Sequence, residues 1–195
     1  MVRVRAVITM LVVIAVGGGA AASAYAQDPP PQTTTSAAAG GAEYGTTSPA
    51  ATPTVPGSIA AIVDGVAYAP ADAPDQIKEL IWSANKIIGM PYVYGGGHSK
   101  FDDTGYDCSG TVSYALHGAS LLSRPRDSSD FYSYGASGRG AWITVYTNHG
   151  HMYLTVAGIR LDTSAVDDPS GLSGPRWRPL RHSNRSYKTR HPVGF

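Results

Sequence analysis

Residues 105–112 read GYDCSGTV and contain Cys108, the only cysteine of the chain. Apolar residues follow it at helical spacing, at Val112, Ala115, Leu116 and Ala119. This pattern predicts a helix whose first turn contains Cys108. The dipole of a helix start favours a thiolate, and its unpaired backbone N–H groups can bind an oxyanion. The stretch alone leaves two interpretations open: a nucleophile, or a small buried core residue.

The remaining elements follow from hydrophobic periodicity on either side of this stretch. An earlier helix is predicted to begin at Asp75, with a buried stripe formed by Ile77, Leu80, Ile81, Ala84, Ile87 and Ile88. Beyond Pro125 the period becomes that of strands, in residues 141–147, 151–156 and 159–163. Helices followed by antiparallel strands predict an α+β domain, with the helices packed on one side of the sheet.

The strand 151–156 supplies a candidate base, His151, on the face opposite its apolar residues. A hairpin through residues 157–158 would place Asp162 diagonal to His151 on that face. An acid beside an imidazole fixes its tautomer and supports its charged form, as in a Cys-His-acid constellation. His149, in the preceding turn, is the rival base. For Asp162 the alternative is an ordinary solvated strand end.

Domain organisation follows from shifts in composition. Residues 1–26 have the basic, apolar and small-residue order of a secretory signal peptide, with an uncleaved anchor as the alternative. Residues 27–58 are rich in Pro, Thr, Ala and Gly and predict a disordered linker. The domain is predicted to span residues 59–195, with a core at about 75–164 and a basic, irregular tail at 167–195. We expect the protein to be secreted.

Composition excludes several kinds of site and partner. The formal net charge is +1, which gives no chain-wide reason to expect nucleic-acid binding. One cysteine excludes an intramolecular disulfide and a multi-thiolate zinc site, and the remaining histidines show no ligand spacing. We therefore expect neither a metal nor a cofactor. We also expect a monomer, with membrane contact only through an uncleaved signal peptide.

Three motifs resemble the NlpC/P60 family of cell-wall cysteine peptidases, which have a papain-like site. They are GMPYVYGGG (89–97), YDCSGTV (106–112) and GHMYLTVAGIRLDT (150–163), in the order found in that family. The resemblance covers about residues 75–164. It implies that the cysteine opens a helix packed on an antiparallel sheet, and that a strand histidine is the base. The loop between the first two motifs is longer than is typical of the family.

Carried over to this chain, the resemblance makes Cys108 the nucleophile, His151 the base and Asp162 the third catalytic residue. It places Tyr92 near the oxyanion site. Asp107 and Ser109 match positions that line the substrate cleft. The implied substrate is a peptidoglycan stem peptide, cut beside a D-γ-glutamyl link to a diamino acid. A secreted, cell-wall-associated thiol hydrolase is therefore the leading hypothesis.

Two other functions remain open on the sequence alone. The basic tail carries Arg176, Arg178, Arg181, Arg185, Lys188 and Arg190. These cations could bind anionic wall polymers in a catalytically inactive domain, although a solvated surface is the simpler interpretation. The same Cys-His chemistry could also pass an acyl group to an amine or alcohol, which would make the protein an acyltransferase.

Overall fold

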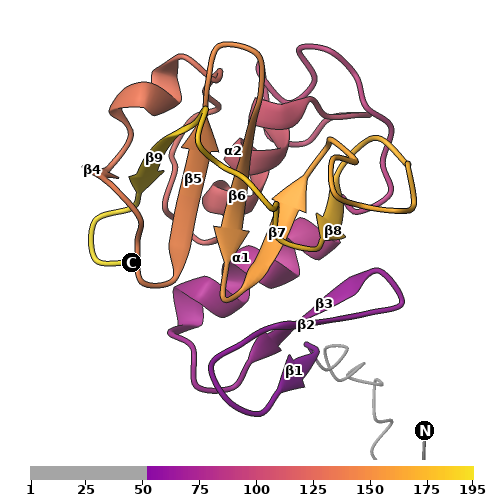
Figure 1. Ribbon diagram of the computed structural model, residues 1–195, viewed down its shortest axis with the longest axis vertical. Helices are drawn as coiled ribbons and strands as arrows, with labels where there is room; N and C mark the ends of the chain where they lie inside the picture. Colours follow the sequence, from indigo (N-terminus) through magenta and orange to yellow (C-terminus); the bar gives the residue numbers. More distant parts are fainter. Residues whose placement is uncertain (1–51) are drawn as a thin grey trace, which may run out of the picture. The chain divides into compact units, whose positions relative to one another are not determined.

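A computed structural model describes residues 52–195, and Figure 1 shows how their helices and strands are arranged. The helical elements are α1 (Asp75–Asn85), α2 (Cys108–Gly118) and a short 3-10 helix, η1 (Asp130–Ser133). The strands are β1 (Thr54–Val55), β2 (Ala61–Val63), β3 (Val66–Pro70), β4 (Ala136–Ser137), β5 (Ile143–Thr147), β6 (Met152–Val156), β7 (Ile159–Asp162), β8 (Arg176–Arg178) and β9 (Lys188–His191). The predicted signal peptide lies outside the described residues.

The larger sheet has six strands in the order β4-β9-β5-β6-β7-β8, and all its neighbouring strands are antiparallel. Both helices lie on one side of it, behind β5, β6 and β7 in Figure 1. This is the α+β architecture that the sequence predicts. No helix among residues 52–195 is long and apolar enough to cross a membrane.

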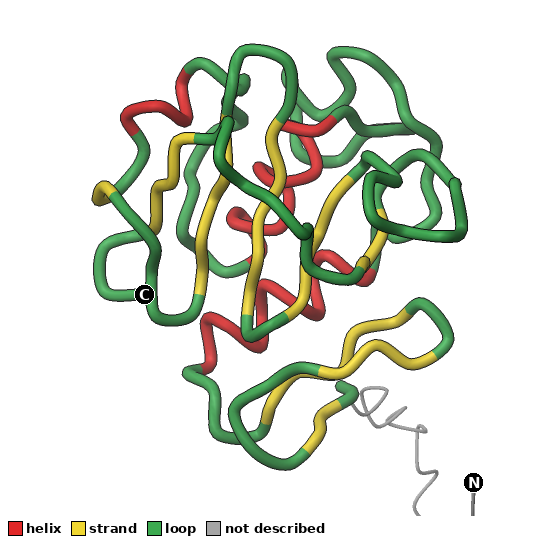
Figure 2. The backbone as a smooth tube through the Cα atoms, in the orientation of Figure 1, coloured by secondary structure: helices red, strands yellow, loops and turns green. Residues whose placement is uncertain are grey.

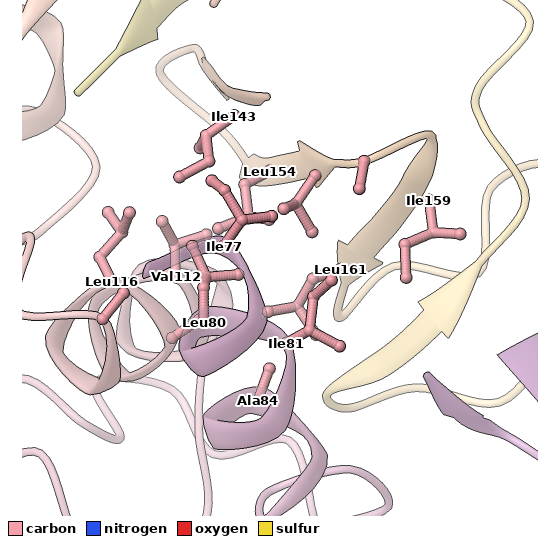
Figure 3. Packing of buried hydrophobic residues seen from close by; sticks show 14 of the residues in the cluster. Ile77, Leu80, Ile81, Ala84, Val112, Leu116, Ile143, Leu154, Ile159 and Leu161 are labelled. Atoms are coloured by element: carbon pink, nitrogen blue, oxygen red, sulfur yellow. The ribbon is translucent and has the colours of Figure 1, made fainter. Parts of the chain in front are cut away.

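The core lies between the helices and the sheet, and Figure 3 shows its packing. The predicted stripe of α1 enters it, so that Ile77, Leu80 and Ile81 are completely buried. Val112 and Leu116 of α2 pack beside them, and the sheet contributes its alternating apolar residues, including Ile143, Leu154 and Leu161. Burying such a side chain stabilises the fold by about 1.5–3 kcal/mol. The core therefore holds the start of α2 against the β6–β7 hairpin.

The β6–β7 hairpin has the predicted register. Val156 pairs with Ile159, and Leu154 pairs with Leu161. The two turn residues, Ala157 and Gly158, have φ values of 45° and 85°. A two-residue turn with positive φ at both positions matches the twist of the strands it joins. The register therefore places Asp162 on the same sheet face as Tyr153, next to His151.

The N-terminal boundary differs from the prediction. Thr54 and Val55 lie within the predicted linker 27–58, but they form β1, which pairs with β3 in a separate three-stranded sheet. The indole N–H of Trp82 donates to the carbonyl of Pro53 at 3.0 Å and ties this strand to α1. Order therefore begins before residue 59. The remainder of the predicted linker, up to residue 51, lies outside the described residues.

The tail also differs from the irregular segment that the sequence predicts. It contributes β8 to one end of the large sheet and inserts β9 between β4 and β5. Between these strands the chain crosses the sheet face opposite the helices, as Figure 2 shows. Arg160 and Arg178 are completely buried, and their partners lie in the segment between β7 and β8: Arg160 donates to the carbonyl of Val166, and Arg178 pairs with Asp168. The tail thus covers the second face of the sheet, and two of its arginine side chains, those of Arg178 and Arg181, are buried.

Candidate active site

Cys108 is the first residue of α2, and its side chain is half-buried. The preceding residue, Asp107, caps the helix because its Oδ1 accepts the backbone N–H of Gly110 at 2.8 Å. The N–H groups of the first turn have no acceptor within a helix, so those of Cys108 and Ser109 remain available to an oxyanion. The positive end of the helix dipole also favours negative charge there. The predicted position of the thiol is therefore confirmed.

A cleft of about 420 Å³ opens beside Cys108. Its lining includes the three residues that the resemblance places near the substrate, Tyr92, Asp107 and Ser109. Burial, together with the nearby Cys108 and Asp107, raises the pKa of Tyr92. The phenol therefore stays protonated and can donate a hydrogen bond into the cleft at neutral pH.

His98 also lines this cleft, and sequence reasoning missed it. Its Nε2 lies 2.9 Å from Oδ2 of Asp107 and 2.8 Å from Oγ of Ser109. The residue comes from the long loop between the first two motifs, where no spacing rule connects it with Asp107. It therefore holds together the two polar groups on either side of Cys108.

His151 lies immediately before β6 and faces Asp162 at the end of β7. Its Nε2 is 2.7 Å from Oδ1 of Asp162. This leaves Nδ1 as the ring nitrogen available to Cys108. The backbone at His151 is itself fixed, because its N–H donates to Oδ1 of Asn148 at 2.8 Å. The structure thus brings together Cys108, His151 and Asp162.

The electrostatics of the pair favour an ionised state. Burial opposes charge on His151, but hydrogen bonding and charge from Asp162 and Cys108 outweigh it and raise the pKa of His151 to about 9. Burial likewise works against the charge of Asp162, yet its bonds to His151, Ser164 and Arg181 hold the pKa of that carboxyl below its usual value. At neutral pH the site therefore contains an imidazolium next to a carboxylate.

Asp162 is not a solvated strand end, since its side chain is completely buried. Its second oxygen, Oδ2, accepts from Arg181 at 2.9 Å and lies 3.6 Å from Nη1 of Arg160. The sequence assigned Arg181 only to a basic tail, because the contact joins residues far apart in the chain. The burial of Arg160 could not be read from the sequence either, because arginine side chains are usually exposed.

His149, the rival base, occupies a different position. It lines the cleft, and its ring centre lies 5.7 Å from that of Tyr132. Asp162 bonds to His151 instead.

Among residues 52–195, no group of three or more His, Cys, Asp or Glu side chains could hold a metal ion.

Gly110 lies where the glycine-rich loop approaches α2 most closely. A Cβ at position 110 would collide with the carbonyl oxygen of Gly96 and lie 3.0 Å from the Cα of Gly97. Glycine is therefore required where the glycine-rich loop crosses the start of α2.

We expect Gly110→Ala to lower the free energy of unfolding by about 1–3 kcal/mol, because the loop and helix start must move apart. Urea unfolding followed by circular dichroism measures this change. Gly150→Ala is the matched control, since a Cβ there has no neighbour closer than 3.9 Å. Equal stability of the two variants would contradict the contact with Gly96.

Comparison with known proteins finds similarity in the part of the chain that carries this candidate site. Residues 89–166 match the model of the NlpC/P60 family. Two curated relatives are both named peptidoglycan endopeptidase RipB, from Mycobacterium tuberculosis strains CDC 1551 / Oshkosh and ATCC 25618 / H37Rv. Each is 31% identical over a 107-residue alignment, and the match covers 42% of this chain and 44% of the relative. The chain thus spans less than half the length of these relatives.

Proposed function

Because residues 89–166 belong to the NlpC/P60 family, we propose that the protein is a peptidoglycan endopeptidase with a cysteine nucleophile. The observation that carries the proposal is the position of Cys108 at the start of α2, beside the His151–Asp162 pair. The name of the similar relatives supports peptidoglycan as the substrate. The signal-like residues 1–26 support secretion and a place at the cell wall.

In the proposed mechanism the thiol proton of Cys108 already resides on His151 as the imidazolium at neutral pH, and the thiolate attacks the carbonyl carbon of an amide. A tetrahedral oxyanion forms, and the N–H groups at the start of α2 can stabilise it. His151 then gives its proton to the leaving amine, which leaves a thioester on Cys108. His151, now neutral, takes a proton from water, the hydroxide hydrolyses the thioester, and the sulfur leaves as a thiolate beside the restored imidazolium.

Asp162 supports both proton transfers. It holds Nε2 of His151, so that Nδ1 stays directed toward the thiol, and its charge stabilises the imidazolium. Tyr92 can donate to the oxyanion or to the substrate. Asp107 and Ser109 line the cleft beside the nucleophile and offer polar partners to a bound peptide.

For the substrate we propose a peptidoglycan stem peptide, with the D-γ-glutamyl link to a diamino acid as the bond cut. The polar lining of the cleft supports a peptide of this kind. Asp107 and Asp127 contribute carboxylates, and His98, Tyr92 and His149 contribute further polar groups. Carboxylates in a cleft favour a ligand that carries an ammonium group, as a diamino acid does.

The pKa of His151 predicts the alkaline limit of activity. Because the leaving amine needs the proton of the imidazolium, activity should fall as the pH rises through the pKa of His151, at about 9. The dependence of kcat/KM on pH, measured with a soluble stem-peptide substrate, tests this expectation. A fall centred near pH 6.5, the ordinary value for histidine, would contradict the raised pKa.

The proposed function is tested by incubating purified peptidoglycan with the mature domain or its Cys108→Ala variant. Released fragments are then identified by mass spectrometry. We expect the wild-type protein to release fragments with new amino and carboxyl ends, and the variant to release none. Empty chromatograms from both proteins would overturn the proposal. If an amine is added to the reaction and the fragments carry it on their new acyl ends, in place of a free carboxyl group, the protein is an acyltransferase.

A further inference from the structure

The two oxygens of Asp162 have separate partners. Oδ1 accepts from His151 and from the backbone N–H of Ser164, at 2.7 and 2.8 Å. Oδ2 accepts from Nε and Nη2 of Arg181, at 3.2 and 2.9 Å. A buried carboxylate loses its hydration and needs partners for all its lone pairs. Arg181 therefore leaves Oδ1 free for the imidazole while it satisfies Oδ2.

Arg181 is itself held in place, which gives it the means to fix the carboxylate. Its Nη1 donates to the hydroxyl of Tyr187 at 3.2 Å. The guanidinium carbon lies 4.6 Å from the ring centre of Tyr153 and 5.5 Å from that of Tyr187. The side chain is only 8% exposed. Stacking and hydrogen bonding together prevent the guanidinium from rotating away from Asp162.

Arg160, the other nearby cation, has a different arrangement. Its Nη1 lies 3.6 Å from Oδ2 of Asp162, beyond hydrogen-bond distance. Within the part of the chain that the structure describes, its buried Nε and Nη1 have no hydrogen-bond partner. Arg160 therefore supplies charge near Asp162 but no directed bond. It can help to keep the carboxylate ionised without setting its orientation.

We propose that Arg181 is a positioning residue, which fixes Oδ2 of Asp162 so that Oδ1 stays aligned with Nε2 of His151. The alignment passes to Cys108 through the imidazole ring. The proposal rests on the function proposed above, and it assigns a role in that reaction to a residue of the tail. Misplacement of a reacting group by about 1 Å can reduce a rate about 100-fold.

The first test compares Arg181→Met, Arg181→Lys and Arg185→Met in hydrolysis of a stem peptide. Methionine keeps the length of the side chain but has neither charge nor donor. We expect Arg181→Met to lower kcat about 10- to 100-fold and to leave KM within about twofold, because the cleft itself is unchanged. Arg185 is exposed, so Arg185→Met controls for the loss of one tail charge. It should retain wild-type kcat.

The lysine variant separates orientation from charge. Lysine keeps the positive charge but lacks the planar fork that reaches Oδ2 through two nitrogens. Arg181→Lys should therefore have a kcat between those of the wild-type and Arg181→Met proteins. Full wild-type kcat in Arg181→Lys would overturn the positioning role, whether or not Arg181→Met folds.

The second test does not depend on peptidoglycan. Carbamidomethylation of Cys108 by iodoacetamide at pH 6 reports how well His151 supports the thiolate. We expect Arg181→Met to react about tenfold more slowly than the wild-type protein. If the wild-type domain releases no wall fragments but this difference is found, only the proposed function fails. If it does release fragments while Arg181→Met keeps wild-type kcat and alkylation rate, only the positioning proposal fails.

Discussion

Replacing His151 by glutamine is expected to lower kcat for stem-peptide hydrolysis by about four orders of magnitude or more. Glutamine preserves much of the size and polarity of the ring but cannot accept or deliver a proton at neutral pH. Both the activation of Cys108 and protonation of the leaving amine would then depend on water. The loss should appear in kcat and kcat/KM together, because the proton transfers occur in the transition state.

His149→Gln is the matched control for this variant. His149 also lines the cleft, but it packs near Tyr132 and does not bond to Asp162. We expect its loss of kcat to remain within about tenfold. Steady-state kinetics with one soluble peptide measures both variants. A larger loss in His149→Gln than in His151→Gln would transfer the role of base to His149.

Asp162→Asn is expected to lower the free energy of unfolding by about 3–5 kcal/mol. Asparagine has nearly the same shape, so the core needs no repacking. It removes the negative charge that faces Arg160, Arg181 and His151 in a completely buried position. Two guanidinium groups would then remain buried without their shared counterion. Most small domains are stable by only about 5–15 kcal/mol, so the change is large.

Urea unfolding at pH 7 measures this loss, with Asp75→Asn as the control. Asp75 also pairs with a cation, Lys78, but its side chain is 94% exposed and solvent screens the pair. That variant should have wild-type stability. Equal stability of the Asp162→Asn and wild-type proteins would show that the charge of Asp162 does not hold the two arginines.

The parts of the fold that the sequence predicts well are those with local, regular patterns. The helical stripe from Ile77 to Ala84 and the alternation of residues 151–156 each have one consistent structural interpretation. The two-residue turn at Ala157–Gly158 then fixes the register, because a shift by one residue would expose the apolar face. The alternation and the turn together therefore suffice to predict that Asp162 lies beside His151.

The missed features depend on contacts between distant segments. Strand β8 reads RWR and β9 reads KTRH, and neither has enough apolar residues to indicate a strand. Arg181 and His98 acquire their roles from partners on other elements, at Asp162 and Asp107. A single sequence carries no spacing rule for such pairs. Burial of charge becomes evident only when the tail is seen to cover the sheet.

The position of β9 has a consequence for the order in which the molecule assembles. This strand lies between β4 and β5, although β6, β7 and β8 all precede it in the chain. Pairing between such distant segments raises the contact order, and domains of high contact order fold slowly. Cys108, His151 and Asp162 have all been synthesised before Arg181 and β9 exist. We therefore expect a nascent or truncated chain to contain the reactive groups without the layer that aligns them.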